Sequence, residues 1–434
     1  MTSEPPSRSP DIEATGVGVA DLTDAENHLI QVQAVFAGAL AIAGIFLSLY
    51  LFSVGSFRTI ASFYAGQYLF QSVFFIIAGY LLRYRSTKYL IRVGSLVLCI
   101  LYMLLVVLGP DARHFAFLLG ALSGIGEGIL WPGINLSEYI ATHNRTRNLY
   151  YGKLFFLSNL ASVIGLPLSG LTITVAKEVS TAQTGYYVLF GILIAILLLT
   201  YRLGAGVDPW TGVTFSTRHM ARHARNPAWK LVLAQNLLRG LWAYTLPAFS
   251  AVLLFLILQE DELSLSILSA ITTIAVGFAS LMAGRYLQRH PKAFLLGAIV
   301  VPVGMVGFAL NQNWLGVAFY SVLILCFDPF AQNTTYKAMY DVMDASSSGW
   351  KDCYHYIVER EIAWNTGRVL SFGGVWWVLS AGDQIDIDIL TKAIATAAVL
   401  PLLVGILQYV LYRMSPAGEG ASVVVTPPIE PTSH

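Results

Sequence analysis

Two short stretches, "GYLLRYRSTK" at residues 79–88 and "GRYLQRHPK" at residues 284–292, decide how this chain is organised. Each stretch begins with a glycine, carries three cations, and joins one long apolar block to the next. A second pair, "YYGKLFFLSN" at 150–159 and "YIVEREIAWN" at 356–365, recurs at nearly the same offset of about 205 residues. We therefore predict two halves of similar structure, each with the same order of apolar blocks.

The apolar blocks around these loops are long enough to cross a membrane. Of the 434 residues, 56% are hydrophobic and 12% are charged, whereas a soluble domain carries about a quarter charged residues. Apolar blocks of about 18 to 25 residues cross the hydrocarbon core of a bilayer as helices. We expect an all-α integral membrane protein with about twelve helices, at residues 30–54, 58–82, 88–109, 114–141, 149–175, 184–202, 229–258, 264–286, 292–310, 314–341, 354–380 and 388–412.

The loops between these helices alternate in charge. Loops at 83–88, 145–147, 218–225 and 285–292 are rich in cations, and the intervening loops carry single cations or acids. The positive-inside rule places the cationic loops, and with them both termini, in the cytoplasm. We expect a protein of the inner membrane of a bacterial cell, divided into a disordered cytoplasmic tail (1–28), a six-helix bundle (29–202), a cytoplasmic linker (203–228), a second six-helix bundle (229–413) and a second disordered tail (414–434).

Over roughly residues 29–413 the chain resembles the major facilitator superfamily. Gly79 and the cations that follow it keep part of the superfamily's loop pattern G-x-x-x-D-R-x-G-R-R, and residues 360–368 read R-E-x-x-x-N-x-G-R, as in a bacterial branch of the superfamily. The resemblance implies two pseudo-symmetric bundles, a monomer, and a central cavity lined by helices 1, 4, 7 and 10. Gly165, Pro167 and Gly170 are similar to part of the pattern G-P-x-x-G-G of exchangers, which favours antiport or export slightly.

Charged residues near the middle of the predicted helices are candidates for function. A charge at the centre of a bilayer costs about 2.5–3.5 kcal/mol, so it requires a polar partner or a water-filled cavity. Glu127, Asp328 and Arg368 lie near helix centres, and Arg239 lies in the inner half of its helix. We expect Glu127 or Asp328 to bind and release a proton, because burial favours the neutral form of a carboxyl group. Arg368 or Arg239 would sense the substrate; the alternative is a structural ion pair between Asp328 and Arg368.

Helical spacing adds polar neighbours to these charges. The side chains of Trp131 and Asn135, followed by Glu138, lie on the same helix face as Glu127, and Asn365 lies on the face of Arg368. Gln67 and Gln71 are one turn apart on the second helix. Two roles are possible for these side chains, contact with the ligand or packing between helices, and the sequence does not decide between them.

Small residues and loop charges give two further expectations. Gly120, Gly124 and Gly128 recur every fourth residue, which predicts close packing of the fourth helix on a neighbour. Glu361 is expected to form a cytoplasmic gate with Arg145 or Arg147, because these charges are opposite in sign and lie toward the same side of the membrane.

Several classes of protein do not fit this sequence. It contains no G-x-x-x-x-G-K-S/T pattern, so ATP does not drive it directly, and an ion gradient, preferably of protons, is expected instead. The histidines are scattered, H-E-x-x-H is absent and the three cysteines form no C-x-x-C, so we expect no enzyme, no metal site and no cofactor. The net charge of +1 gives no argument for nucleic acid. The expected partners are the lipid bilayer and a small molecule or ion; a receptor or assembly role without transport, and transport of an inorganic ion, are the alternatives.

Overall fold

The computed structural model describes residues 22–142, 147–222, 225–311, 313–346, 349–379, 392 and 394–414. These residues are almost entirely helical. The first part of the chain holds α1 (Asp24–Val54), α2 (Phe57–Leu81), α3 (Thr87–Leu108), the turn η2 (Gly109–Phe115), α4 (Ala116–Ala141), α5 (Arg147–Val179) and α6 (Ala182–Leu203). The second part holds α8 (Pro227–Gly240), α9 (Thr245–Ile257), α10 (Glu262–Arg289), α11 (Phe294–Leu310), α12 (Trp314–Ser346), α13 (Trp350–Leu379) and α15 (Val399–Met414).

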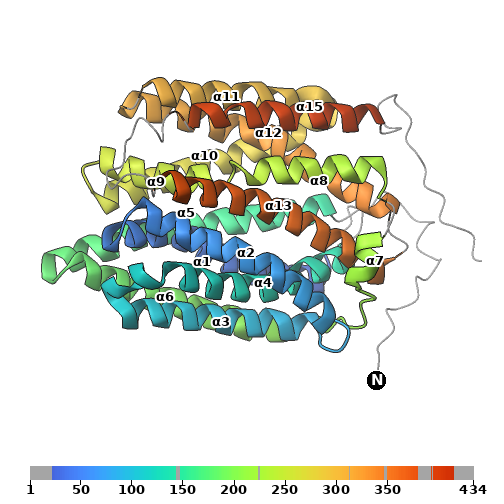
Figure 1. The fold of residues 1–434 in the computed structure, drawn as a ribbon, viewed down its shortest axis with the longest axis horizontal. Helices are drawn as coiled ribbons and strands as arrows, with labels where there is room; N and C mark the ends of the chain where they lie inside the picture. Colours follow the sequence, from blue (N-terminus) through green and yellow to red (C-terminus); the bar gives the residue numbers. More distant parts are fainter. Residues whose placement is uncertain are drawn as a thin grey trace, which may run out of the picture.

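The helices lie side by side in layers (Figure 1). Helices α3, α4 and α6 form one side of the molecule, and α11, α12 and α15 form the opposite side. The first and second parts of the chain meet mainly along two pairs of helices, α2 with α13 and α5 with α10. A functional site between the two halves therefore has α2 and α13 as its walls.

Most of the described helices have the length and composition of membrane spans. Nine helical segments of the described residues qualify, and one of them, Thr87–Ala141, contains both α3 and α4. Helices α12 and α13 have 33 and 30 residues, but they carry several charges, including Asp328 and Arg368, which lower their mean hydropathy. The expected all-α membrane architecture is confirmed, and the count of twelve spans stays a prediction.

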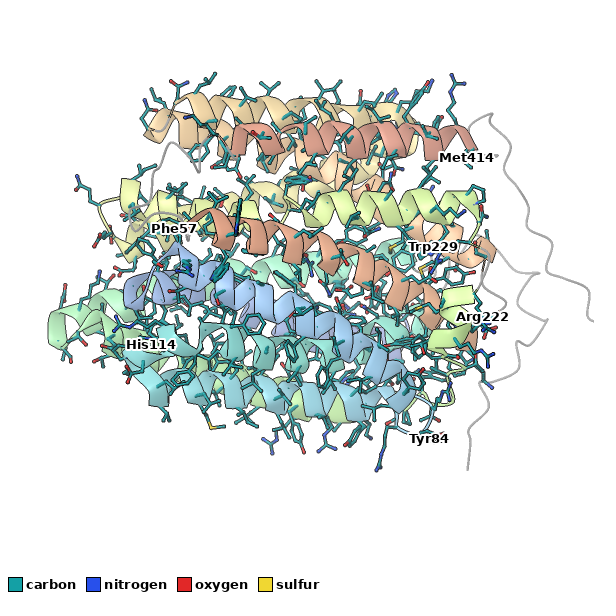
Figure 2. The ribbon with its side chains drawn as sticks, viewed as in Figure 1. Phe57, Tyr84, His114, Arg222, Trp229 and Met414 are labelled. Atoms are coloured by element: carbon teal, nitrogen blue, oxygen red, sulfur yellow. The ribbon has the colours of Figure 1, made fainter. Side chains whose placement is uncertain are left out.

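Successive loops lie at opposite ends of the helices (Figure 2). Tyr84, Arg222, Trp229 and Met414 lie at one end, and Phe57 and His114 lie at the other. The cation-rich loops that contain Tyr84 and Arg222 are thus on the same side, as the alternation of loop charge predicts. We call the end that holds Tyr84 the basic end.

The glycine spacing of α4 brings that helix against α2. A Cβ atom at Gly124 would lie 2.1 Å from the carbonyl oxygen of Gln67. Gly120 and Gly128 face the backbone of the same helix, where a Cβ atom would lie within 1.9 and 2.8 Å of a carbonyl oxygen. Only residues without a side chain permit this approach, so the predicted packing role of the three glycines is confirmed.

The predicted helix 229–258 is broken in its middle. Helix α8 ends at Gly240, residues 241–244 form a turn, and α9 begins at Thr245. Pro247 explains the break, because proline has no N–H group to donate to the carbonyl of Ala243 and its ring clashes with that carbonyl in a regular helix. The break places the side chain of Tyr244 beside the centre of α13, as described below.

The segment that joins the halves follows the basic end. After η3 (Gly204–Gly206), the backbone N–H of Gly212 donates to the carbonyl of Leu82 at 2.9 Å, and that of Thr214 donates to the carbonyl of Lys351 at 3.3 Å. The side chain of Phe215 is fully buried. The short helix α7 (Thr217–Arg222) follows. The linker therefore contacts the α2–α3 turn of one half and the start of α13 in the other.

Candidate functional site

A buried carboxylate on α13 is the centre of a polar network that crosses from one half to the other. Oε1 of Glu361 accepts hydrogen bonds from Nδ2 of Asn365 at 3.2 Å and from Nε2 of Gln71 on α2 at 3.5 Å. Its Oε2 accepts one from Nη2 of Arg360 at 3.2 Å. Nη1 of Arg368 lies 3.8 Å from Oε1 and donates to Oδ1 of Asn365 at 2.7 Å. All five side chains are buried, so the network holds its charges away from water.

The second carboxylate of this region is held by a neutral group. Glu127 on α4 is 9% exposed, and its Oε1 accepts a hydrogen bond from Nε2 of Gln67 on α2 at 2.8 Å. The charges of Arg368 and Glu361 act on it, and the Trp131 side chain also interacts with it. Among the described residues, the ion pairs do not include Glu127. Its charge is therefore less well compensated than that of Glu361.

Three aromatic rings surround the guanidinium group of Arg368. Its Cζ lies 3.6 Å from the ring centre of Tyr244, 4.5 Å from that of Tyr68 and 4.6 Å from that of Trp364. Cations over aromatic faces are attracted by the ring quadrupole. The rings come from α2, from α13 and from the break between α8 and α9. We call Arg368 with these three rings the arginine cage.

The remaining midplane charges form a separate pair in the second half. Nη2 of Arg239 on α8 lies 3.4 Å from Oδ2 of Asp328 on α12. The two residues line a small pocket together with Trp242 and Pro401. The alternative interpretation of a structural pair between Asp328 and Arg368 is wrong, because Asp328 pairs with Arg239 and Arg368 lies by Glu361.

The structure brings most of the predicted site residues together. Gln71, Glu361, Asn365 and Arg368 form one network, and Asp328 and Arg239 form a separate pair. Glu127 and Gln67 form a hydrogen-bonded pair on which the charges of that network act. Trp131 packs edge-on against Phe36, with 5.4 Å between ring centres, and Asn135 is partly buried. For the predicted gate, Arg145 and the side chain of Arg147 lie outside the described residues. The contacts of Glu361 are with the central network, so its role as a gate stays a prediction.

A different carboxylate joins the halves near the basic end. Glu138 on α4 accepts hydrogen bonds from Nε2 of Gln33 on α1 at 3.1 Å and from the hydroxyl group of Tyr151 on α5. It also accepts one from the hydroxyl group of Tyr340 on α12 at 3.2 Å. Of these three bonds to Glu138, the one from Tyr340 crosses between the halves. We call this group the Glu138 cluster.

An ion pair joins the two halves at the opposite end. Lys177 on α5 pairs with Glu262 on α10, and its Nζ lies 3.4 Å from the carbonyl oxygen of Glu260. Asp261 caps α10 by accepting the N–H of Leu263 at 3.1 Å, and hydrogen bonding holds its pKa below the usual value. The cap and the ion pair fix the start of α10 against α5. Contacts between the halves therefore exist at both ends of the central network.

Sequence reasoning missed two of the three rings of the arginine cage, those of Trp364 and Tyr244. Trp364 lies four residues before Arg368, so helical spacing places it on the same face, and this signal was available. Pro247, which predicts the break that positions Tyr244, was a second signal. The contact of Tyr340 with Glu138 carried no local signal, because these residues are far apart in the sequence.

The fold and the site define a class of protein. Apolar helices in two halves, with a network of buried charges across their interface, have the architecture of a transporter that carries a solute across a membrane. The model of the Major Facilitator Superfamily matches residues 29–349, and this chain belongs to that superfamily. It is therefore an integral membrane protein of a family that transports solutes.

Other proteins are similar to this chain in sequence or in fold. The chain is 23% identical over 360 residues to YqgE of Bacillus subtilis (strain 168), described as an uncharacterized protein, covering 82% of this chain and 83% of the relative. Among solved structures, a mutant form of the nucleoside transporter NupG has a TM-score of 0.66 at 12% identity, covering 90% of this chain and 100% of that one. A bacterial homologue of the iron transporter ferroportin, in its inward-facing state, has a TM-score of 0.63 at 12% identity, covering 90% and 99%. These structures share the fold with this chain.

Proposed function

We propose that this protein is a proton-coupled secondary transporter that carries a small solute by alternating access, with Glu127 as the residue that binds the proton. Two six-helix bundles, at 29–202 and 229–413, would rock about the central network. The same proposal places the chain as a monomer in the inner membrane of a bacterial cell. The basic end and both termini then face the cytoplasm, because cation-rich loops are retained there.

The observation that carries the proposal is the environment of Glu127. Its carboxylate is buried between α2 and α4, and the hydrogen bond from Gln67 is neutral. Burial without a paired cation disfavours the ionised carboxylate, so uptake of a proton relieves the cost. The carboxylate of Asp328 is partly exposed and paired with Arg239, so its ionised form does not carry the same cost. Of the two predicted proton carriers, the geometry therefore favours Glu127.

The contacts at the two ends of the network support alternating access. The Glu138 cluster joins the halves near the basic end, and the pair of Lys177 with Glu262 joins them at the other end. Transport requires these contacts to break in turn. A proton on Glu127, whose charge acts on Arg368 and Glu361 across the interface, changes the attraction between the halves and so biases the exchange.

The test is proton movement in liposomes that contain the full-length protein and an internal pH dye. Metabolites, drugs and ions are screened for substrate-dependent pH change with the wild type, Glu127→Gln and Asp328→Asn. Glu178→Gln, which removes an exposed carboxylate at the end of α5, is the matched control. We expect Glu127→Gln to retain substrate binding and lose proton movement, and the other two variants to keep it. Equal proton movement in Glu127→Gln and the wild type would exclude Glu127 as the carrier.

The direction of transport has two candidates: import together with protons, and export in exchange for protons. Gly170, part of the pattern that resembles exchangers, lies on α5 against α10, where a Cβ atom would be 2.8 Å from the carbonyl oxygen of Glu262. The sign of the pH change distinguishes exchange from symport. Exchange acidifies the compartment that loses the substrate, whereas symport acidifies the compartment that gains it. Binding of substrates without transport, in either proton or sodium gradients, would favour the receptor or assembly role.

A further inference from the structure

We infer that the substrate is an organic anion with a carboxylate group, which the arginine cage binds. This inference rests on the proposed function, because it names the solute class of the same site. It follows from three features of the described residues: hydrogen-bond donors without partners, the balance of charge when Glu127 is protonated, and the apolar walls of the cage.

Buried donors around the cage have no hydrogen-bond partner within the described part of the chain. They are Nε of Arg368, Nε1 of Trp364 and Nε of Arg360. Arg368 is 5% exposed, and Trp364 and Arg360 are also buried. A buried donor without a partner costs about 1–3 kcal/mol, and more when it is charged. One buried acceptor of the central network, Oε1 of Gln71, also has no partner there, so the three donors outnumber it. A ligand carboxylate supplies the missing acceptor atoms, and an ammonium group does not.

The balance of charge indicates the same class of ligand. Arg360 and Arg368 carry two positive charges, and Glu127 and Glu361 carry two negative charges when both are ionised. Protonation of Glu127 leaves one positive charge in excess, which a monovalent anion neutralises. The hydroxyl groups of Tyr64 and Tyr68 on α2 and Tyr102 on α3 also face Glu127, but tyrosine ordinarily titrates at about pH 10, so these groups are neutral. Proton and anion would therefore bind together, which favours symport.

The walls of the cage favour an anion with an apolar or aromatic body. Tyr64 stacks on Phe372 at 5.0 Å, and the ring centre of Tyr68 lies 5.8 Å from that of Phe372, next to the cage. Tyr244 is 38% exposed, whereas Arg368 and Trp364 are buried. Arginine presents its N–H groups in a plane that matches a carboxylate, while the rings contact the rest of the ligand.

The experiment measures binding to the purified full-length protein. The probes are benzoate, hexanoate and a panel of other aliphatic and aromatic monocarboxylates, each compared with its primary amide and the corresponding amine. Trp364→Phe removes one N–H group and keeps a ring in the cage. Trp377→Phe, at a position on the same helix that is 72% exposed, is the matched control. Arg368→Lys keeps the charge and removes the planar group.

We expect at least one carboxylate to bind more tightly than its amide and amine. Trp364→Phe should weaken this binding about 10- to 100-fold, the effect of one hydrogen bond to a charged group, and Trp377→Phe should not. Wild-type affinity should fall as the pH rises, and Glu127→Gln, which resembles the protonated residue, should bind with little dependence on pH. Preference for an amine, failure of the whole carboxylate panel to bind, or equal effects of the two tryptophan substitutions would overturn the inference.

The outcome is separable from that of the proposed function. Proton movement driven by another class of substrate and lost in Glu127→Gln would leave the proposed function standing and reject the carboxylate. Binding of carboxylates with the expected response of Trp364→Phe, but without proton movement in liposomes, would keep the carboxylate as ligand and reject the proposed proton coupling. Each result therefore rejects one of the two statements.

Discussion

Replacing Tyr340 with phenylalanine should open the basic end of the transporter. In the structure the hydroxyl group of Tyr340 donates to Oε1 of Glu138 at 3.2 Å, and this bond joins α12 to α4 across the two halves. Glu138 keeps its bonds from Gln33 and Tyr151, which lie in its own half, so the carboxylate remains hydrogen-bonded in the variant. The substitution thus removes a contact that exists only while this end is closed.

The size of the effect follows from the chemistry of that contact. A hydrogen bond to a charged group contributes about 1.5–3 kcal/mol net of exchange with water. Each 1.4 kcal/mol is a factor of about ten in an equilibrium constant. Tyr340→Phe should therefore shift the ratio of open to closed molecules at the basic end by about 10- to 100-fold. Gln33→Met removes a hydrogen bond to the same carboxylate from a side chain whose hydrogen bonds, to Glu138 and Tyr150, lie within the first half, so it should shift the ratio little.

The assay is a distance measurement between the two halves. Spin labels on cysteines introduced at Tyr84, which is 82% exposed, and at Met414 report the separation at the basic end by double electron–electron resonance. The background for this measurement requires replacement of the native cysteines Cys99, Cys326 and Cys353. A larger population at long distance is expected in Tyr340→Phe. Identical distributions in Tyr340→Phe and the wild type, or an equal shift in Gln33→Met, would refute the reasoning.

Two further predictions concern packing and the opposite end. Gly124→Leu should lower the midpoint of thermal unfolding by forcing α2 away from α4, at a cost of about 3 kcal/mol or more. The control Gly44→Leu, at a position with open space around it, should leave the midpoint unchanged. Equal midpoints for the two variants would argue against the close contact. Lys177→Met should leave the buried Glu262 unpaired and favour opening at that end. A cysteine introduced at the buried Ser266 should then react about fivefold faster or more with an impermeant maleimide, and an unchanged rate would show that the ion pair does not hold this end closed.

Features of single segments could be predicted from the sequence. Apolar length and loop charge are such features, which is why the helical membrane fold and the alternation of loops agree with the structure. The packing of Gly120, Gly124 and Gly128 also follows from local spacing, although the sequence does not say that α2 is the partner. The break before Pro247 was missed because proline within a membrane helix has several outcomes, from a mild kink to a turn.

The pairing of charges could not be predicted, because it depends on how helices are rotated and tilted. Asp328 and Arg368 lie on neighbouring helices of the sequence, and an ion pair between them was a reasonable alternative. In the structure Asp328 faces α8 and pairs with Arg239, while Arg368 faces α2 and the aromatic rings. A rotation of one helix by a few tens of degrees exchanges such partners, and composition and spacing do not specify that rotation.

The break between α8 and α9 gives the two parts of one membrane span different mechanical attachments. Helix α9 packs on α1 of the first half and meets the start of α2, where the rings of Phe57 and Phe249 lie 5.5 Å apart, whereas α8 packs on α13 and α15 of the second half. A helix transmits force along its axis while its hydrogen-bond ladder is continuous, and Pro247 interrupts that ladder. When the halves separate at the end that holds Phe57, α9 can swing about residues 241–244 without turning α8. Tyr244 lies in this turn and is also a ring of the arginine cage, so a ligand bound in the proposed site would contact the point about which α9 swings.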